Sequence, residues 1–178
     1  MNSKPEISSA LNRRDLLKAG VALSATALPL TRAIKTQAAE ERKLRTAHIA
    51  VGGMGWSDRK SLITHPQLEV VALCDVDSNE LAGAAKEHPS AKTFSDYRKL
   101  FAEMAGEFDA VVVSTPDHTH APAAMMALNH GKHVYCQKPL THDIFEARKL
   151  RLLAEKRELT TQMGIQVSSS LEYRGALN

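Results

Sequence analysis

Short apolar segments alternate with longer stretches of helical pattern from about residue 44 onward. Most of these segments are too short and too rich in β-branched residues to form helices, and their near-continuous apolar character is typical of strands buried on both faces of a sheet. We therefore predict five strands, at residues 46–51, 68–74, 110–114, 133–136 and 160–164.

Helices are predicted in the intervals between these strands. Ser78 and Ser95 are residue types that favour helix N-caps, Pro122 is tolerated in a first helical turn, and Pro89 and Gly131 are typical of helix ends. The helices are expected to begin near Trp56, Ser78, Ser95, Ala121 and Thr141. Repeated strand–helix units predict an α/β fold with a doubly wound, parallel sheet and right-handed crossovers.

The length and composition fit one such domain. A chain of 178 residues with 43% hydrophobic and 24% charged residues is not typical of disordered, collagen-like or disulfide-stapled proteins. No apolar run reaches the ~18 residues that a membrane span requires. The formal charge of +3 comes from residues 1–39, which hold six Lys or Arg against two acidic residues, whereas the remainder holds 17 against 18. Because the predicted domain lacks a basic excess, we do not expect nucleic acid as a partner.

The first 39 residues have the anatomy of an export signal. A polar stretch with Arg13 and Arg14 precedes a weakly apolar run over residues 19–30, and Ala38 and Ala39 lie in a small-residue pattern typical of cleavage sites. Adjacent arginines before a weakly hydrophobic run resemble a twin-arginine leader, which would direct the protein through that export machinery to the periplasm. A basic amphipathic helix on the domain surface is the alternative interpretation.

The first predicted strand runs into an Ala-Val-Gly-Gly-Met-Gly turn, which we compare with the dinucleotide-binding pattern G-x-G-x-x-G. Gly52 and Gly55 occupy its second and third glycine positions, where the backbone approaches a pyrophosphate and a helix packs against a strand. Gly53 and Met54 lie between them, at a helix N-terminus whose N–H groups favour phosphate. Ala50 replaces the first glycine, and it fits only if the turn does not require a positive φ. A plain glycine-rich turn is the alternative.

An acidic residue follows the second predicted strand at the spacing that this pattern expects. Asp75 lies twenty residues after Gly55, where a carboxylate can accept hydrogen bonds from both ribose hydroxyls of an adenosine. Val76 follows, with no Lys or Arg beside it to bind a 2′-phosphate, so NAD is favoured over NADP as the cofactor. Alternatively, Asp75 and Asp77 only begin a turn and cap the next helix.

A polar segment follows the third predicted strand. Its residues that we predict to contact cofactor or substrate at the C-terminal edge of the sheet are Ser114, Thr115, Pro116, His118 and His120. The two histidines, with Asp117, also suggest a metal site. Zinc generally requires three or four protein ligands and a helix begins at once, so we predict no metal. A solvated loop is the remaining alternative.

Cys74 and Cys136 are the two cysteines of the chain, and an exported protein could pair them. In the strand order 3-2-1-4-5-6, one strand would separate theirs, which gives a distance of about 9.6 Å. A disulfide requires Cα atoms within ~7 Å. We therefore expect two buried free thiols.

The fourth predicted strand ends in Gln137-Lys138-Pro139, opposite the expected cofactor crevice. A surface lysine that ends a strand is one interpretation. However, the motifs together resemble the Gfo/Idh/MocA oxidoreductase family, in its N-terminal NAD(P)-binding Rossmann domain. The resemblance covers roughly residues 44–170, and the motifs that carry it are Asp75, Thr115-Pro116 with His120, residues 131–134, and Gln137-Lys138-Pro139.

The resemblance implies an NAD(P)-dependent enzyme acting on the CH–OH groups of sugars or polyols. The lysine of the family's Glu-Lys-Pro motif lies at the nicotinamide and the substrate, so Lys138 is implied to be catalytic and, with Gln137, to contact the cofactor. A lysine there donates a hydrogen bond to a carbinol oxygen and stabilises charge that develops as hydride leaves. Gln137 replaces the family's glutamate, so we expect the motif to keep its hydrogen bonding but lose its negative charge. Asp117 stands where asparagine is usual.

The resemblance also implies a second, mostly antiparallel domain that supplies substrate contacts. We therefore assign residues 1–39 to the leader, 40–170 to the NAD(P)-binding domain and 171–178 to the start of a substrate domain that this chain lacks. Without that domain a bound nicotinamide would be open to water, so we expect little or no turnover by the chain alone.

Other functions remain open at this point. The chain could be a truncated, non-catalytic nucleotide-binding module, or half of an NAD-dependent glycosidase in which transient oxidation activates an elimination. A methyltransferase also uses glycine-rich turns, but it has no need of the Gln-Lys-Pro motif. The sequence does not specify the substrate, and it leaves open whether the protein forms a homo-oligomer.

Overall fold

Within residues 42–176, the part of the chain that the computed structural model describes, six parallel strands form one sheet. The strands are β1 (Leu44–Ile49), β2 (Leu68–Cys74), β3 (Lys92–Phe94), β4 (Ala110–Val113), β5 (His133–Gln137) and β6 (Thr161–Gly164). They pair in the order β3-β2-β1-β4-β5-β6. The predicted doubly wound α/β fold is confirmed. The predicted leader lies outside the described residues.

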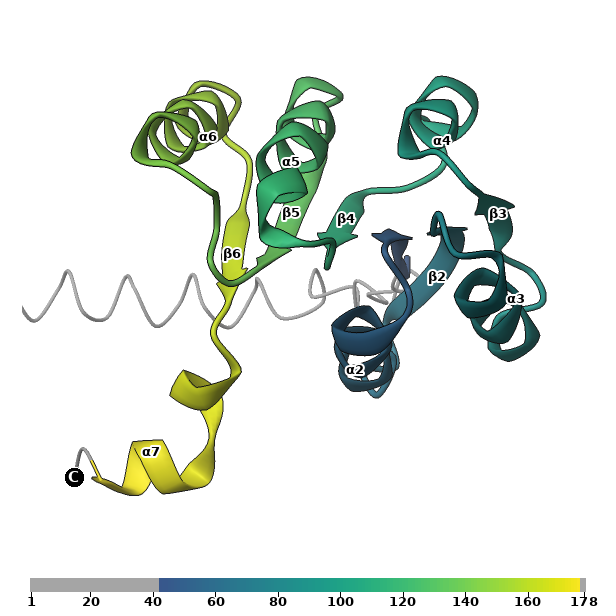
Figure 1. Cartoon of the computed structure of the whole chain (residues 1–178), viewed down its shortest axis with the longest axis horizontal. Coiled ribbons are helices and arrows are strands. Elements are labelled where there is room, and N and C mark those ends of the chain that lie inside the picture. The colour runs from purple at the N-terminus through teal and green to yellow at the C-terminus, as the bar shows by residue number, and fades with distance from the viewer. Residues whose placement is uncertain (1–41, 177–178) are drawn as a thin grey trace, which may run out of the picture. The chain divides into compact units, whose positions relative to one another are not determined.

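Helices cover both faces of the sheet (Figure 1). The helices that connect the strands are α2 (Gly53–Leu62), α3 (Ser78–Glu87), α4 (Tyr97–Met104), α5 (His120–Asn129) and α6 (Ile144–Lys156). Figure 1 shows α2 and α3 on one face and α4, α5 and α6 on the other. Two 3₁₀ turns, η1 (Asp117–Thr119) and η2 (Gln166–Ser169), and a short helix, α7 (Leu171–Ala176), complete the described chain. No helix in this part of the chain is long and apolar enough to cross a membrane.

Aspartates, not the predicted serines, cap α3 and α4. Asp77 accepts hydrogen bonds from the N–H groups of Asn79 and Glu80 at the start of α3, and Asp96 accepts the N–H of Arg98 at the start of α4. Ser78 is instead the first residue of α3. An ionised side chain at the N-cap satisfies free N–H groups and also complements the positive end of the helix dipole.

The strand β3 was missed in the sequence because it carries almost no apolar pattern. Of its three residues only Phe94 is buried. Its presence changes the position of every later strand, so that β4 pairs with β1 and β5 pairs with β4.

The two cysteines are therefore further apart than expected. Cys74 lies on β2 and Cys136 on β5, with β1 and β4 between them. Three strand spacings amount to roughly 14 Å, so the distance of 9.6 Å was wrong. Both thiols are free and buried, which confirms the prediction that they do not pair.

The two faces of β1 differ in what they bury. Ala47 and Ile49 belong to the large apolar core beneath α4, α5 and α6. His48 points to the other face because side chains alternate along a strand. That face buries His48 and Arg59 almost completely, and Arg59 forms an ion pair with Glu87 at the end of α3.

Candidate functional site

A cavity of about 460 Å³ lies at the carboxyl ends of β1, β2 and β4. The chain leaves β1 toward β2 and β3 on one side, and then returns to β4 on the other side of β1. Open α/β sheets bind ligands at such a reversal of strand order, outside the carboxyl ends of the strands. The predicted site residues that line this cavity are Asp75, Thr115, Pro116 and His118.

The turn between β1 and α2 requires glycine at position 55. A Cβ atom on Gly55 would collide with the carbonyl oxygen of Ala50 and would lie 3.3 Å from the Cβ atom of Ser114. At Gly52 the added atom would meet the carboxylate of Glu80 at 2.6 Å, and this flexible side chain can move away. Gly55 is therefore the strict requirement for packing α2 against the sheet.

The N-terminus of α2 offers free N–H groups to an anion. Gly52 is the N-cap, without a capping side chain, and Gly53 and Met54 are exposed in the first turn, which contains no acidic residue. The first N–H groups of a helix have no partner within the helix, and the helix dipole adds a partial positive charge. This arrangement suits a pyrophosphate.

Ala50 adopts a left-handed backbone conformation, with a φ of 66°. We expected alanine to fit here only if the turn did not require a positive φ, and this condition was wrong because the turn does require it. A non-glycine residue pays about 1–2 kcal/mol in this conformation. The cavity therefore lies beside a strained backbone position.

Asp75 joins the end of β2 to the glycine turn. Its Oδ2 accepts hydrogen bonds from the backbone N–H groups of Val51, at 2.8 Å, and Gly52, at 3.3 Å. Its Oδ1 accepts the N–H of Asp77 at 3.0 Å. An ionised carboxylate has about four acceptor positions, so Asp75 retains capacity for a ligand hydroxyl. The alternative role of helix cap applies to Asp77 only.

Thr115 contributes a polar atom that needs a partner. Its Oγ1 is buried and has no hydrogen bond among the described residues, while the residue itself lines the cavity. A buried hydroxyl without a partner is unfavourable, and it indicates a polar group supplied by a ligand. The glycine turn, Asp75 and Thr115 together fit the pyrophosphate and ribose of a dinucleotide.

The two predicted histidines have different positions. His118 is exposed and lies 3.7 Å from the carboxylate of Asp117, measured from its Nδ1. His120 is buried, with its Nε2 2.6 Å from the carbonyl oxygen of Thr115 and its Nδ1 2.7 Å from that of Pro139. His120 therefore links the loop after β4 to the turn after β5. Between residues 42 and 176, no group of three or more His, Cys, Asp or Glu residues is arranged to hold a metal ion.

Lys138 is exposed in the turn that follows β5, ahead of a cis peptide bond to Pro139. The preceding residue, Gln137, is buried and donates its side-chain N–H groups to both carboxylate oxygens of Asp58, at 2.8 and 2.9 Å. The Oγ atom of Ser114 donates a hydrogen bond to the same carboxylate at 2.7 Å. Ser114 is not among the residues that line the cavity.

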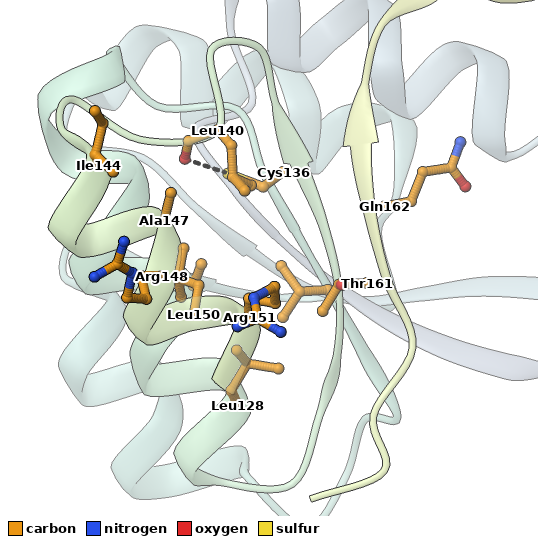
Figure 2. Close-up of a pocket in the computed structure, with 12 residues that line it drawn as sticks. Leu128, Cys136, Leu140, Ile144, Ala147, Arg148, Leu150, Arg151, Thr161 and Gln162 are labelled. Carbon is orange, nitrogen blue, oxygen red and sulfur yellow. Dashed lines mark hydrogen bonds between the residues drawn. The ribbon is translucent and has the colours of Figure 1, made fainter. Parts of the chain in front are cut away.

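A second cavity, of about 430 Å³, lies between α5, α6 and the strands β5 and β6 (Figure 2). Its lining is mostly apolar, with Arg148 and Arg151 contributed by α6. Figure 2 also shows the contact of Cys136 with the carbonyl oxygen of Leu140, at 3.8 Å. Apart from these groups the lining offers few polar atoms, and it contains none of the predicted site residues. The cavity at β1, β2 and β4 is therefore the candidate site.

The family model for Gfo/Idh/MocA proteins, described as an oxidoreductase family with an NAD-binding Rossmann fold, matches residues 44–165. The chain belongs to the Gfo/Idh/MocA family. The predicted resemblance and the NAD-binding domain are thereby confirmed.

The relatives of this chain include inositol dehydrogenases and a glycosyl hydrolase family protein. The inositol 2-dehydrogenase of Rubrobacter xylanophilus is 32% identical over 112 residues, 62% of this chain and 31% of the relative. A glycosyl hydrolase family 109 protein of Stenotrophomonas maltophilia is 36% identical over 139 residues, 72% of this chain and 30% of the relative. The crystal structure of myo-inositol 2-dehydrogenase from Lactobacillus plantarum has a TM-score of 0.69 and 27% identity, over 75% of this chain and 40% of that one. The chain thus spans about a third of the length of these curated relatives.

The network around Asp58 adds a residue that the Gfo/Idh/MocA motif does not contain. Gln137 carries no charge and keeps its hydrogen bonding, as expected, and the buried carboxyl group of Asp58 lies directly beside it. Asp58 was missed in the sequence. The available signal was its position three residues after Gly55, which places an acidic side chain on the sheet-facing side of α2.

Proposed function

We propose that this chain is the NAD-binding part of an oxidoreductase that transfers a hydride to or from a carbinol carbon of a sugar or polyol. The observation that carries the proposal is the cavity at the reversal of strand order, which Asp75 and Thr115 line next to the glycine turn. The inositol dehydrogenases among the relatives support a polyol as the substrate class.

The chemistry assigns one role to Lys138. NAD supplies the hydride acceptor or donor when it is bound. As an alcohol is oxidised, its carbon loses a hydride and its oxygen loses a proton. Lys138 follows β5 at the same carboxyl edge of the sheet, and its exposed side chain can donate a hydrogen bond to the carbinol oxygen and stabilise the negative charge that develops there, while the proton leaves to solvent.

NAD is the proposed form of the cofactor. The carboxylate of Asp75 in the cavity favours ribose hydroxyls and repels a 2′-phosphate, and Val76 beside it is exposed and uncharged. Arg98 also lines the cavity, but its guanidinium group lies 3.4 Å from Asp96 and stacks over the Tyr97 ring at 5.5 Å. The Arg98 guanidinium group, the cation that a 2′-phosphate would need, therefore already has other partners.

The test combines cofactor binding with hydride transfer. The chain is titrated with NADH, and it is then incubated with NAD and inositols or sugars deuterated at their carbinol carbons. We expect NADH to bind. Deuterium should appear in the nicotinamide only slowly, because a nicotinamide open to water should turn over little, and Lys138→Ala should lose this slow transfer while it keeps the binding. Absence of NADH binding would overturn the proposal. Binding with no transfer would favour a non-catalytic module. Transfer that Lys138→Ala leaves unchanged would overturn the role of Lys138.

A second candidate is an NAD-dependent glycosidase, favoured by the 36% identity to the glycosyl hydrolase family 109 protein. In such a reaction the oxidation is transient, so NAD is regenerated in each cycle. Product analysis separates the two candidates. A dehydrogenase forms a ketone and an equal amount of NADH, whereas a glycosidase releases a free sugar from a glycoside without net formation of NADH.

We also propose that residues 1–39 act as a twin-arginine leader and that the protein is periplasmic. The support is the sequence pattern of Arg13 and Arg14 before a weakly apolar run. The double substitution Arg13→Lys with Arg14→Lys should keep the protein in the cytoplasm, as measured by protease protection in cell fractions. Wild-type protein found only in the cytoplasm with an intact N-terminus would contradict the proposal.

A further inference from the structure

Asp58 is a buried carboxylate on α2, in the turn of helix that follows Gly55. Only 5% of the residue is exposed, and its oxygens accept hydrogen bonds from three side chains. Each donor comes from a different part of the fold. The donors are Ser114 Oγ after β4 at 2.7 Å, Gln137 Nε2 in β5 at 2.8 and 2.9 Å, and Gln166 Nε2 in η2 at 3.3 Å.

The contact with Asp58 fixes the orientation of the Gln137 amide. Because Nε2 donates to the carboxylate, Oε1 points the other way and accepts the backbone N–H of Lys138 at 3.2 Å. An amide side chain can donate at one end and accept at the other, whereas an ionised carboxylate only accepts. Gln137 therefore transmits the position of Asp58 to the backbone of Lys138.

We propose that Asp58 is the positioning residue for Lys138 and acts through the side-chain amide of Gln137. The inference rests on the proposed function in one respect, which is that Lys138 works at the carbinol carbon. The first turn of α2 provides the phosphate-binding N–H groups, and its second turn carries Asp58. One rigid helix thus holds the cofactor cradle and the lysine turn at a fixed separation, as hydride transfer requires.

The first experiment measures amide hydrogen exchange at Lys138 by NMR, with the Val134 amide in the centre of β5 as an internal reference. In Asp58→Ala we expect Lys138 to exchange about tenfold faster relative to Val134, because its acceptor is no longer held in place. Ser114→Ala is the matched control. It removes another partner of the same carboxylate, and it should leave the Lys138 rate unchanged.

A second pair of variants keeps the inference testable if Asp58→Ala does not fold. Gln137→Glu places two carboxylates in contact, so it should also accelerate exchange at Lys138. Adding Asp58→Asn places an amide donor at position 58 and a carboxylate acceptor at position 137, the reverse of the wild-type pair. The double variant should therefore return the Lys138 exchange rate to that of the wild type. Rescue of this kind supports the inference. An unchanged Lys138 rate in Gln137→Glu, or a failure of Asp58→Asn to rescue it, overturns the inference.

Titration with NADH on the same samples separates this inference from the proposed function. If the wild type does not bind NADH, the proposed function fails, while the exchange rates still decide whether Asp58 positions Lys138. If NADH binds normally and the Lys138 amide is insensitive to the Asp58 and Gln137 substitutions, the inference fails and the proposed function stands.

Discussion

The Oδ2 atom of Asp75 accepts a 2.8 Å hydrogen bond from the backbone N–H of Val51, which ties the end of β2 to the glycine turn after β1. The same carboxylate lines the candidate cofactor cavity. One side chain therefore orders the phosphate-binding turn and offers an acceptor for ribose, so its loss should affect binding in two ways.

Asp75→Ala should weaken NADH binding by at least about tenfold, because a charge-assisted hydrogen bond and the order of the turn are both lost. The preference for NADH over NADPH should also decrease, since the carboxylate no longer repels a 2′-phosphate. Parallel titrations with NADH and NADPH measure both effects. Asp77→Ala is the control. It should cost about 1 kcal/mol of stability through the lost helix cap and leave the cofactor preference unchanged. An unaltered preference in Asp75→Ala would contradict the assignment.

Ala50→Gly should stabilise the protein. Ala50 has a φ of 66°, and glycine adopts this conformation without steric cost. The relief of about 1–2 kcal/mol exceeds the extra entropy that glycine loses on folding, so a net gain of about 0.5–1 kcal/mol is expected. Urea denaturation measures it. Ala105→Gly is the matched control, because Ala105 has a φ of −55° and the same substitution should there be destabilising. A loss of stability in Ala50→Gly would contradict the strain.

Gly55→Ala should have the opposite effect. Its Cβ atom would collide with the carbonyl oxygen of Ala50, so α2 would have to shift away from the sheet and NADH binding should be lost. Gly83→Ala is the matched control. Gly83 lies within α3 with no atom near the added methyl group, and alanine should stabilise that helix by about 0.5–1 kcal/mol. Normal NADH binding by Gly55→Ala would show that the turn does not hold the pyrophosphate.

The sequence predicted those elements whose own residues contain the pattern that makes them form. Residues 68–74 form an apolar run, and they match β2 at both ends. Asp75 could be assigned because the glycine turn and the end of β2 lie at a fixed spacing in this fold. In both cases the relevant interactions are local, or follow from a motif that includes the residues.

The elements that were missed depend on distant partners. The strand β3 forms because β2 offers it hydrogen bonds, and Phe94 is its one buried residue. Asp58 resembles an exposed helix residue in the sequence. It is buried beside three donors, Ser114, Gln137 and Gln166, which lie 56, 79 and 108 residues away along the chain. A local sequence pattern cannot show that distant side chains will donate hydrogen bonds to a buried carboxyl group.

The two cysteines should be chemically inert in the folded protein. Burial raises the pKa of each thiol, Cys74 and Cys136, to about 12. Since the thiolate is the reactive form, iodoacetamide at about pH 8 should modify neither residue in the native chain and both after denaturation. Mass spectrometry under non-reducing conditions measures this. A native mass lighter by two hydrogen atoms would instead reveal a disulfide.

The buried His48 should make the fold sensitive to mild acid. Burial lowers its pKa to about 3, and the positive charges of Arg59 and His88 act in the same direction. The unfolded chain binds this proton below about pH 6.5, whereas the folded chain does so only near pH 3. Stability should therefore decrease as the pH falls below about 6.5, by up to about 1.4 kcal/mol per pH unit for this one group, and this contribution should level off near pH 3.

His48→Gln removes the titrating ring. The slope of the unfolding free energy against pH between about 6.5 and 5 should therefore decrease by an amount that corresponds to close to one bound proton. Urea denaturation at a series of pH values gives this slope. Thr46→Val is the control. It removes the hydroxyl that contacts His48 Nε2 at 3.1 Å, which lowers stability, but it keeps the ring and therefore the slope. Equal slopes in His48→Gln and the wild type would show that protonation of His48 does not oppose folding, and that another group, with His88 the next candidate, causes the loss of stability in acid.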